Sequence, residues 1–199
     1  MDSNQLVIDL FHSSIDVTMR TLDEQATRVS ECGSMMVRCL LNEHKILCCG
    51  EGISGAITQV FCTHLLNRFD YERPGLPAFN LSADATTVTA LTGDSGFKDI
   101  FAHQIRALGQ SGDLLFVISN GDNSGTTLEA IKAAHDRDMP VICLSNQLSN
   151  DFSALLQPED IELQVPSSSK ARIIETQLQI VNYLSELIDQ HLFGSHQTQ

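Results

Sequence analysis

Short apolar segments that lack polar alternation recur along this chain, and they constrain its fold more than any other feature. The strongest is residues 113–119 (DLLFVIS), and residues 45–49, 77–81, 140–144 and 161–165 have the same character. Strands without alternation are buried on both faces, as in a parallel sheet that helices cover on both sides. The sequence therefore predicts an α/β domain built on five parallel strands.

Segments with helical periodicity separate these strands, which predicts a three-layer, doubly wound arrangement. After the first strand we expect a helical segment to about residue 68, a helical turn at residues 86–91, and helices at residues 97–108, 128–136 and 171–193. Two further helical stretches, residues 4–29 and 31–41, precede the first strand.

The 199 residues fit one domain that can bury a core without disulfides or a structural metal. Within it we expect residues 1–43 to form N-terminal oligomerisation helices and residues 44–193 to form the α/β core. Residues 194–199 are expected to be a frayed tail.

The charge balance disfavours direct binding of nucleic acid. The chain has 12 Lys and Arg against 25 Asp and Glu, a net charge of −13, and no basic stripe. It has neither a signal-peptide pattern nor an apolar run long enough to cross a bilayer, so we expect a cytoplasmic protein without membrane contact. The six cysteines lack metal-site spacing and are expected to be buried, reduced thiols.

Two turns that join a strand to a helix are candidates for ligand binding, because ligands of such sheets lie beyond the carboxyl ends of the strands. They are residues 50–55 (GEGISG) and 119–124 (SNGDNS). Free backbone N–H groups and the helix dipole favour an anion there, and the hydroxyls of Ser54, Ser119 and Ser124 add donors. Ordinary turn chemistry accounts for these residues equally well, so the residues alone leave both readings open.

Several segments resemble the bacterial phosphoheptose isomerases over nearly the whole chain, from about residue 6 to residue 193. They occur in the family's order: KILCCGEGIS, NRFDYERPGLPAFNL, ALGQSGDLLFVISNGDNS, VPSSSKARI and a final LIDQHLF. The likeness extends to a non-housekeeping branch of that family, the DiaA-like proteins that associate with the replication initiator DnaA. This resemblance implies a flavodoxin-like SIS domain that forms a homotetramer and binds a sugar phosphate.

The resemblance also assigns roles to individual residues. It implies phosphosugar binding by Ser54, Ser119, Asn123 and Ser124 in the two turns and by Asp94.

The zinc ligands of the isomerases fall on four positions that are occupied here by Val60, His64, Ile174 and Asn182. Zinc needs imidazole, thiolate or carboxylate at most of its positions, so we expect no metal and no cofactor; zinc enters only if the protein is an isomerase. His64 is then the one weak candidate for a catalytic residue, and Glu175 a distant second. A lone helical histidine is more often packed or solvent-facing.

Charged residues alter the phosphate turns as well. Glu51 and Asp122 stand where the family favours Asn and Gly. A carboxylate at ~5 Å from a phosphate charge costs ~3 kcal/mol at an effective dielectric near 20, unless the side chain points away. Lys170, beside the start of the last helix, offsets part of that cost.

The last helix ends in Leu192 and Phe193, which match the pair that the resemblance associates with binding DnaA. Taken alone, such a pair is more often a core or tetramer contact. Together with the missing ligands, the match predicts a non-catalytic adaptor that binds DnaA and promotes its assembly at the chromosomal origin. The alternatives are an isomerase that converts sedoheptulose 7-phosphate to D-glycero-D-manno-heptose 7-phosphate, and a regulator that binds a sugar phosphate.

Overall fold

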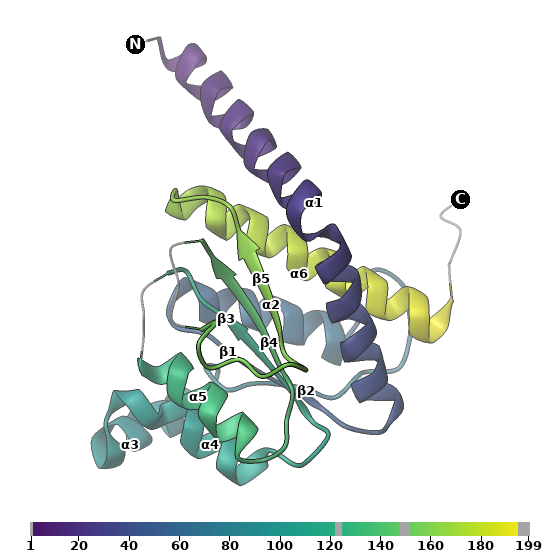
Figure 1. Cartoon of the computed structure of the whole chain (residues 1–199), viewed down its shortest axis with the longest axis vertical. Helices are drawn as coiled ribbons and strands as arrows, with labels where there is room; N and C mark the ends of the chain where they lie inside the picture. Colours follow the sequence, from purple (N-terminus) through teal and green to yellow (C-terminus); the bar gives the residue numbers. More distant parts are fainter. Residues whose placement is uncertain (1, 122–124, 148–151, 195–199) are drawn as a thin grey trace.

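The computed structural model describes residues 2–121, 125–147 and 152–194, and it contains one five-stranded sheet. The strand order is β2-β1-β3-β4-β5, and every neighbouring pair is parallel (Figure 1). This is the flavodoxin-like order, in which the chain reverses direction across the sheet between β1 and β3. The prediction of a doubly wound parallel sheet is confirmed. The strands are β1 (Ile46–Cys49), β2 (Ala78–Asn80), β3 (Leu114–Ile118), β4 (Val141–Asn146) and β5 (Ile161–Val165).

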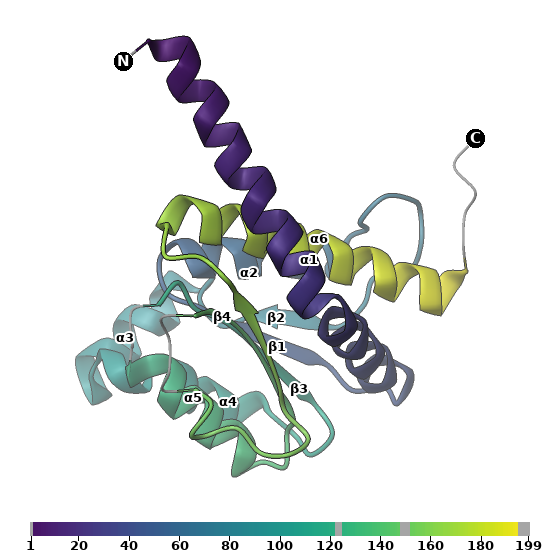
Figure 2. The ribbon, with the colours of Figure 1, turned by 45° about the horizontal axis from the view of Figure 1, so that its top comes forward.

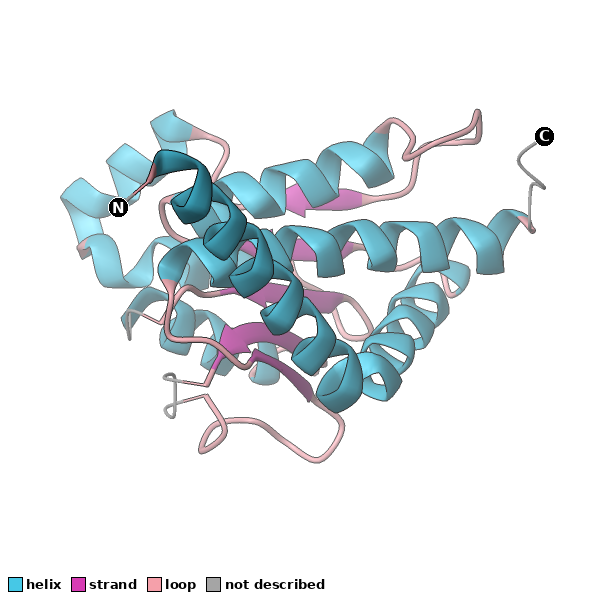
Figure 3. Ribbon diagram, turned by 90° about the horizontal axis from the view of Figure 1, so that it is seen from above, coloured by secondary structure: helices cyan, strands magenta, loops and turns pink. Residues whose placement is uncertain are grey.

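Helices cover both faces of the sheet and bury two apolar clusters (Figures 1 and 3). Helices α1, α2 and α6 pack on one face, whereas α3, α4 and α5 lie on the other side of the sheet. The central strands β1, β3 and β4 are buried at every position, which explains their unbroken apolar sequences. The helices are α1 (Ser3–Leu41), α2 (Ile53–Leu66), α3 (Ala85–Ser95), η1 (Phe97–Asp99), α4 (Ile100–Leu108), α5 (Gly125–His135) and α6 (Lys170–Phe193).

Three helices differ from the expected ranges. The two predicted N-terminal stretches form one continuous helix, α1, because nothing between them breaks the hydrogen-bonded ladder. Helix α3 is longer than the expected turn, since the Asp84 carboxylate accepts hydrogen bonds from the Thr86 and Thr87 amides and so caps its first turn. The predicted 97–108 helix begins as the short 3₁₀ helix η1 before it continues as α4.

Helix α1 combines a packed half with a projecting half (Figure 2). Its C-terminal half packs on α6 at close range: a Cβ at Gly33 would lie only 3.2 Å from the Leu187 Cβ. Its N-terminal half extends beyond the α/β body and leaves large apolar side chains 44–67% exposed. These side chains are Leu6, Val7, Ile8, Leu10, Phe11, Ile15, Met19 and Leu22.

The cysteine thiols are buried and unpaired by disulfides, as expected for small core side chains. Burial raises the pKa of Cys32 and of Cys39 to about 12, so neither forms a reactive thiolate near neutral pH. No helix in the described part of the chain is long and apolar enough to cross a bilayer.

Candidate functional site

The candidate site lies at the carboxyl ends of β1 and β3, the neighbouring strands between which the chain reverses direction across the sheet. Such a reversal opens a crevice, because the connections after the two strands leave toward opposite faces of the sheet. The turn after β1 leads into α2, and the turn after β3 leads toward α5.

Two glycines shape the turn after β1. A Cβ at Gly50 would lie 2.8 Å from the Ser54 carbonyl carbon and 2.9 Å from the Ile118 carbonyl oxygen, so only glycine lets these backbones approach. Gly52 has a φ of 54° and caps α2 without a side-chain contact. The backbone of the turn therefore lies close to the end of β3.

The crevice holds a cavity of about 310 Å³ whose walls come from four parts of the fold. They are the β1–α2 turn, the end of β3, the first turn of α5 and the beginning of α6. The described residues that line it are Glu51, Gly52, Ile53, Ser54, Ile118, Ser119, Asn120, Thr127, Lys170 and Ile174.

Three helices begin at this cavity. Ser54 lies in the first turn of α2, Thr127 in the first turn of α5, and Lys170 is the first residue of α6. Each helix N-terminus carries partial positive charge, which favours an anion. The Lys170 ammonium adds a full positive charge to the same wall, so the cavity suits the phosphate of a small ligand.

The Glu51 side chain contacts the beginning of α5. Its carboxylate oxygen Oε1 accepts a hydrogen bond from the hydroxyl of Thr126. The carboxylate thus lies at the N-terminus of α5. The repulsion between the Glu51 carboxylate and a bound phosphate, which the sequence predicts, is therefore strongest near α5 and falls with distance from it.

The structure gathers some of the predicted phosphosugar residues and separates others. Ser54 and Ser119 line the cavity, in line with the prediction. Asp94 is exposed near the end of α3 and does not line it. Asn123 and Ser124, like Asp122, lie outside the described residues. The binding role of all these residues stays a prediction.

The four positions that the resemblance assigns to zinc do not form a metal site here. Val60 and Ile174 pack against the core and offer no donor atom. Among the described residues, no three His, Cys, Asp or Glu side chains lie close enough together to hold a metal ion. The residues at these positions therefore do not fit zinc.

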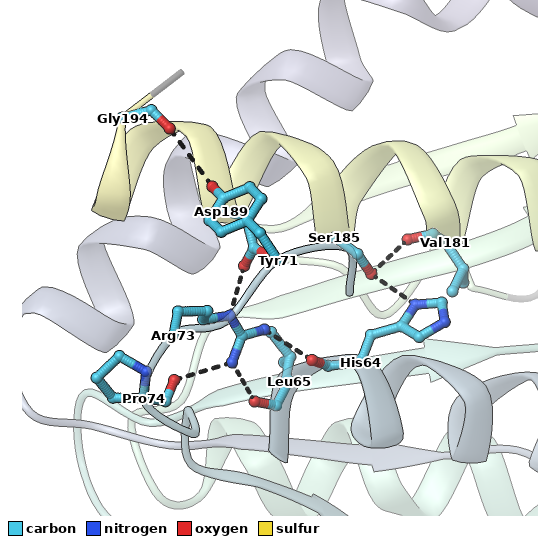
Figure 4. Close-up of polar contacts among 9 residues, drawn as sticks. All are labelled: His64, Leu65, Tyr71, Arg73, Pro74, Val181, Ser185, Asp189 and Gly194. Atoms are coloured by element: carbon cyan, nitrogen blue, oxygen red, sulfur yellow. Dashed lines mark hydrogen bonds and ion pairs between the residues drawn. The ribbon is translucent and has the colours of Figure 1, made fainter. Parts of the chain in front are cut away.

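His64 belongs to a separate polar cluster between α2 and α6 (Figure 4). Its Nδ1 lies 3.1 Å from the Ser185 hydroxyl, whose own hydrogen goes to the Val181 carbonyl at 2.9 Å. Nδ1–H is therefore the donor, and Nε2 is the basic nitrogen. Burial lowers the pKa of His64, although nearby Asp189 opposes the shift. His64 does not line the cavity, so its predicted catalytic role has no geometric support.

Arg73 and Asp189 form a buried ion pair beside His64 (Figure 4). Their side chains are each 2% exposed, and the Arg73 Nε donates to Asp189 at 2.9 Å. Arg73 also donates to the carbonyls of His64 and Leu65 at 2.7 and 2.6 Å, which satisfies the C-terminal end of α2. Burial raises the pKa of Asp189 despite the opposing guanidinium.

The end of α6 is also used within the fold. Leu192 packs against the core, and the Arg73 guanidinium lies 5.8 Å from the centre of the Phe193 ring. Both side chains are partly buried by these contacts.

Glu175, the other candidate base, faces α1 rather than the cavity. Its carboxylate accepts hydrogen bonds from the Ser14 hydroxyl at 2.9 Å and from Arg172 at 2.6 Å. Arg172 also donates to the Leu10 carbonyl at 2.6 Å. This network joins α6 to α1, so its role is structural.

Comparison with known families decides the ancestry of this fold and cavity. The SIS domain pattern matches residues 10–146, which is more than half of the chain. The chain belongs to the SIS domain family. Within that family it falls among the phosphoheptose isomerases, since relatives with that name cover almost its full length.

This SIS domain is 44% identical to a phosphoheptose isomerase of Chromohalobacter salexigens over 195 residues, 98% of this chain and 99% of the relative. It is 42% identical to the phosphoheptose isomerase of Coxiella burnetii over 185 residues, 93% of each chain. Among solved structures, a phosphoheptose isomerase from Francisella tularensis has a TM-score of 0.91 and 40% identity, covering 96% of this chain and all of that one. The phosphoheptose isomerase GmhA of Neisseria gonorrhoeae has a TM-score of 0.89 and 34% identity, with 95% and 100% covered.

These comparisons overturn the prediction of a non-catalytic DnaA adaptor. The full-length relatives at 41–44% identity carry the name phosphoheptose isomerase, and none of these findings supports DnaA binding. The physical reason lies at the end of α6, where the contacts of Leu192 and Phe193 with the core and with Arg73 account for both side chains.

Sequence reasoning missed three lining residues, Ile53, Asn120 and Thr127, and the hydrogen bond from Thr126 to Glu51. Ile53 and Asn120 lie in the two turns that the sequence singles out, so their place in the turns was a usable signal. Thr126 and Thr127 lie at the beginning of α5, after the second of these turns, and no sequence motif marks them as site residues.

Proposed function

We propose that this protein is a phosphosugar isomerase of the phosphoheptose isomerase kind, with sedoheptulose 7-phosphate as its substrate. The observation that carries the proposal is the cavity between β1 and β3, at which three helix N-termini and Lys170 meet. Such a site holds a phosphate by backbone N–H groups and charge, and it leaves Ser54, Ser119 and Asn120 to hydrogen-bond the sugar hydroxyls. The names of the full-length relatives support the same substrate class.

A second candidate is a regulator that binds the same sugar phosphate without converting it. The apolar side chains Val60 and Ile174, at positions that the resemblance gives to zinc ligands, favour this reading. Both candidates use one cavity, and they differ only in whether bound ligand is turned over.

The experiment measures binding and turnover of sedoheptulose 7-phosphate side by side. Calorimetry gives the affinity, and NMR follows conversion of the ketose to the aldose. Replacing Lys170→Glu should weaken binding at least roughly tenfold, since two unit charges at 5 Å interact by ~3 kcal/mol at an effective dielectric near 20.

The matched control is Lys132→Glu, the same change at a half-exposed lysine in the last turn of α5. It should leave the affinity unchanged. Binding without turnover would select the regulator, whereas no binding by the wild type, or equal binding by Lys170→Glu, would refute the cavity as the phosphosugar site.

We also propose that the protein is a cytoplasmic homotetramer in which α1 supplies subunit contacts. The large apolar side chains on the projecting half of α1 support the subunit contacts, because a lone subunit would leave them in water.

A further inference from the structure

Isomerisation of a ketose phosphate needs a base that carries a proton between C1 and C2 of the sugar. The base must reach the ligand, so it must line the cavity. Among the described residues, Glu51 and Lys170 are the only ionisable side chains that do so. A protonated lysine cannot accept the proton, which leaves the Glu51 carboxylate.

The other candidates are placed elsewhere by their contacts. His64 lies in the cluster with Ser185, and Glu175 is held by Arg172 and Ser14 against α1. Neither side chain lines the cavity. The geometry thus separates Glu51 from every base that the sequence suggests.

The structure also positions the Glu51 carboxylate. It follows Gly50 directly after β1, where the close backbone approach to Ile118 fixes the turn. The Thr126 hydroxyl then donates to Oε1 at the start of α5. A side chain that is held by its backbone turn and by a hydrogen bond to its carboxylate is oriented before the ligand arrives, which is what efficient proton transfer requires.

We propose that Glu51 is the catalytic base of the isomerase, an inference that rests on the proposed function. The carboxylate removes one hydrogen of C1 as a proton; the C1–H electron pair forms the C1=C2 double bond, and the C2 carbonyl electrons move onto O2. The O1–H proton then passes to O2 as the C1=O bond forms, and Glu51 returns its proton to C2. Atoms and electrons balance without a metal or an oxidant.

Two features of the cavity stabilise the anion that this step creates. The N-termini of α2 and α6 and the Lys170 ammonium face the same space, and each favours negative charge on the sugar oxygens or phosphate. Proton removal by Glu51 also neutralises the carboxylate at the moment when negative charge appears on the ligand.

The test is deuterium exchange at C1 of sedoheptulose 7-phosphate in D₂O, followed by NMR. Exchange reports proton removal even where net conversion is slow. The wild type should exchange one C1 hydrogen, and Glu51→Gln should slow the exchange at least roughly a hundredfold, the scale of a lost general base. Its binding, measured by calorimetry, should stay equal or become tighter, because a negative charge leaves the cavity.

Two further variants complete the design. Glu159→Gln makes the same change at an exposed glutamate just before β5, on the side of the sheet where the strands begin. The cavity lies where they end, so this variant should exchange like the wild type. Glu51→Asp restores the carboxylate one methylene shorter and should recover part of the exchange, which also covers a failure of Glu51→Gln to fold.

The outcomes separate the two proposals. Exchange by Glu51→Gln within about threefold of the wild type would overturn the role of Glu51 while leaving the isomerase standing. Binding without exchange in the wild type would overturn the isomerase, and the role of Glu51 with it.

Discussion

At the scale of single residues, His64 shows how burial sets a charge state. The ring lies between α2 and α6, donates to Ser185, and packs edge-on against Phe69 with ring centres 4.8 Å apart. Burial penalises the charged form and lowers the pKa of His64 below its ordinary value of 6.5. The neutral imidazole is therefore the form that fits the folded protein.

This lowered pKa predicts a pH dependence of stability. Below pH 6.5 the unfolded chain takes up the proton more readily than the folded one, so His64 costs stability as the pH falls through that value. In thermal melts at pH ~8 and pH ~5.5, the wild type should lose more Tm on acidification than His64→Gln. His12→Gln, at an exposed histidine of α1, is the control and should follow the wild type. Equal losses in all three proteins would contradict the assignment.

At the scale of elements, the Arg73–Asp189 pair joins the end of α2 to α6. The pair is buried, and burial raises the pKa of Asp189 even with the guanidinium in contact. The free-energy cost of desolvating the two ions therefore cancels much of the free energy gained from their attraction. Arg73 also donates to the carbonyls of His64 and Leu65, and the Leu65 carbonyl accepts a second hydrogen bond from the Leu76 amide.

Breaking the pair should cost far more than removing it. Arg73→Met leaves a buried carboxylate uncompensated and should lower the free energy of unfolding by ~3–5 kcal/mol. Adding Asp189→Leu should recover at least ~1 kcal/mol, since two apolar side chains can pack where the ions lay. Urea unfolding of Arg73→Met, Asp189→Leu and the double variant measures the difference. If the double variant were as unstable as the sum of the single changes, the ion pair would not be the cause.

At the scale of the whole molecule, α1 is the element that the fold of one subunit leaves unfinished. Its C-terminal half packs on α6 and on the sheet, whereas its N-terminal half projects with an apolar stripe (Figure 2). Phe11, Ile15 and Leu22 recur on it at spacings of four and seven residues, and they are 55–67% exposed. A stripe of this size is typical of a subunit contact.

The stripe predicts that oligomer size depends on α1. Phe11→Ser combined with Ile15→Ser should lower the mass measured by light scattering, while circular dichroism shows that helix content is kept. The control is Leu108→Ser, at an exposed leucine at the end of α4, which should keep the wild-type mass. An unchanged mass in the α1 variant would show that subunits associate through another surface.

The sequence determined the layers and the location of the cavity. Unbroken apolar strands such as residues 114–118 can be buried only in a covered parallel sheet, and the turns after β1 and β3 then meet at one edge. The sequence also shows that Val60 and Ile174 cannot ligate zinc, because their side chains have no donor atoms in any conformation.

The tertiary structure decided which side chains share the cavity. The sequence suggests His64 and Glu175 as bases, but neither lines the cavity, whereas Glu51 does. In the tertiary structure Leu192 packs against the core and Phe193 lies beside Arg73, whereas the sequence predicted a partner site there. The contact between Thr126 and Glu51 joins residues that are 75 positions apart in the sequence. The local periodicity of a sequence does not show which residues so far apart come into contact.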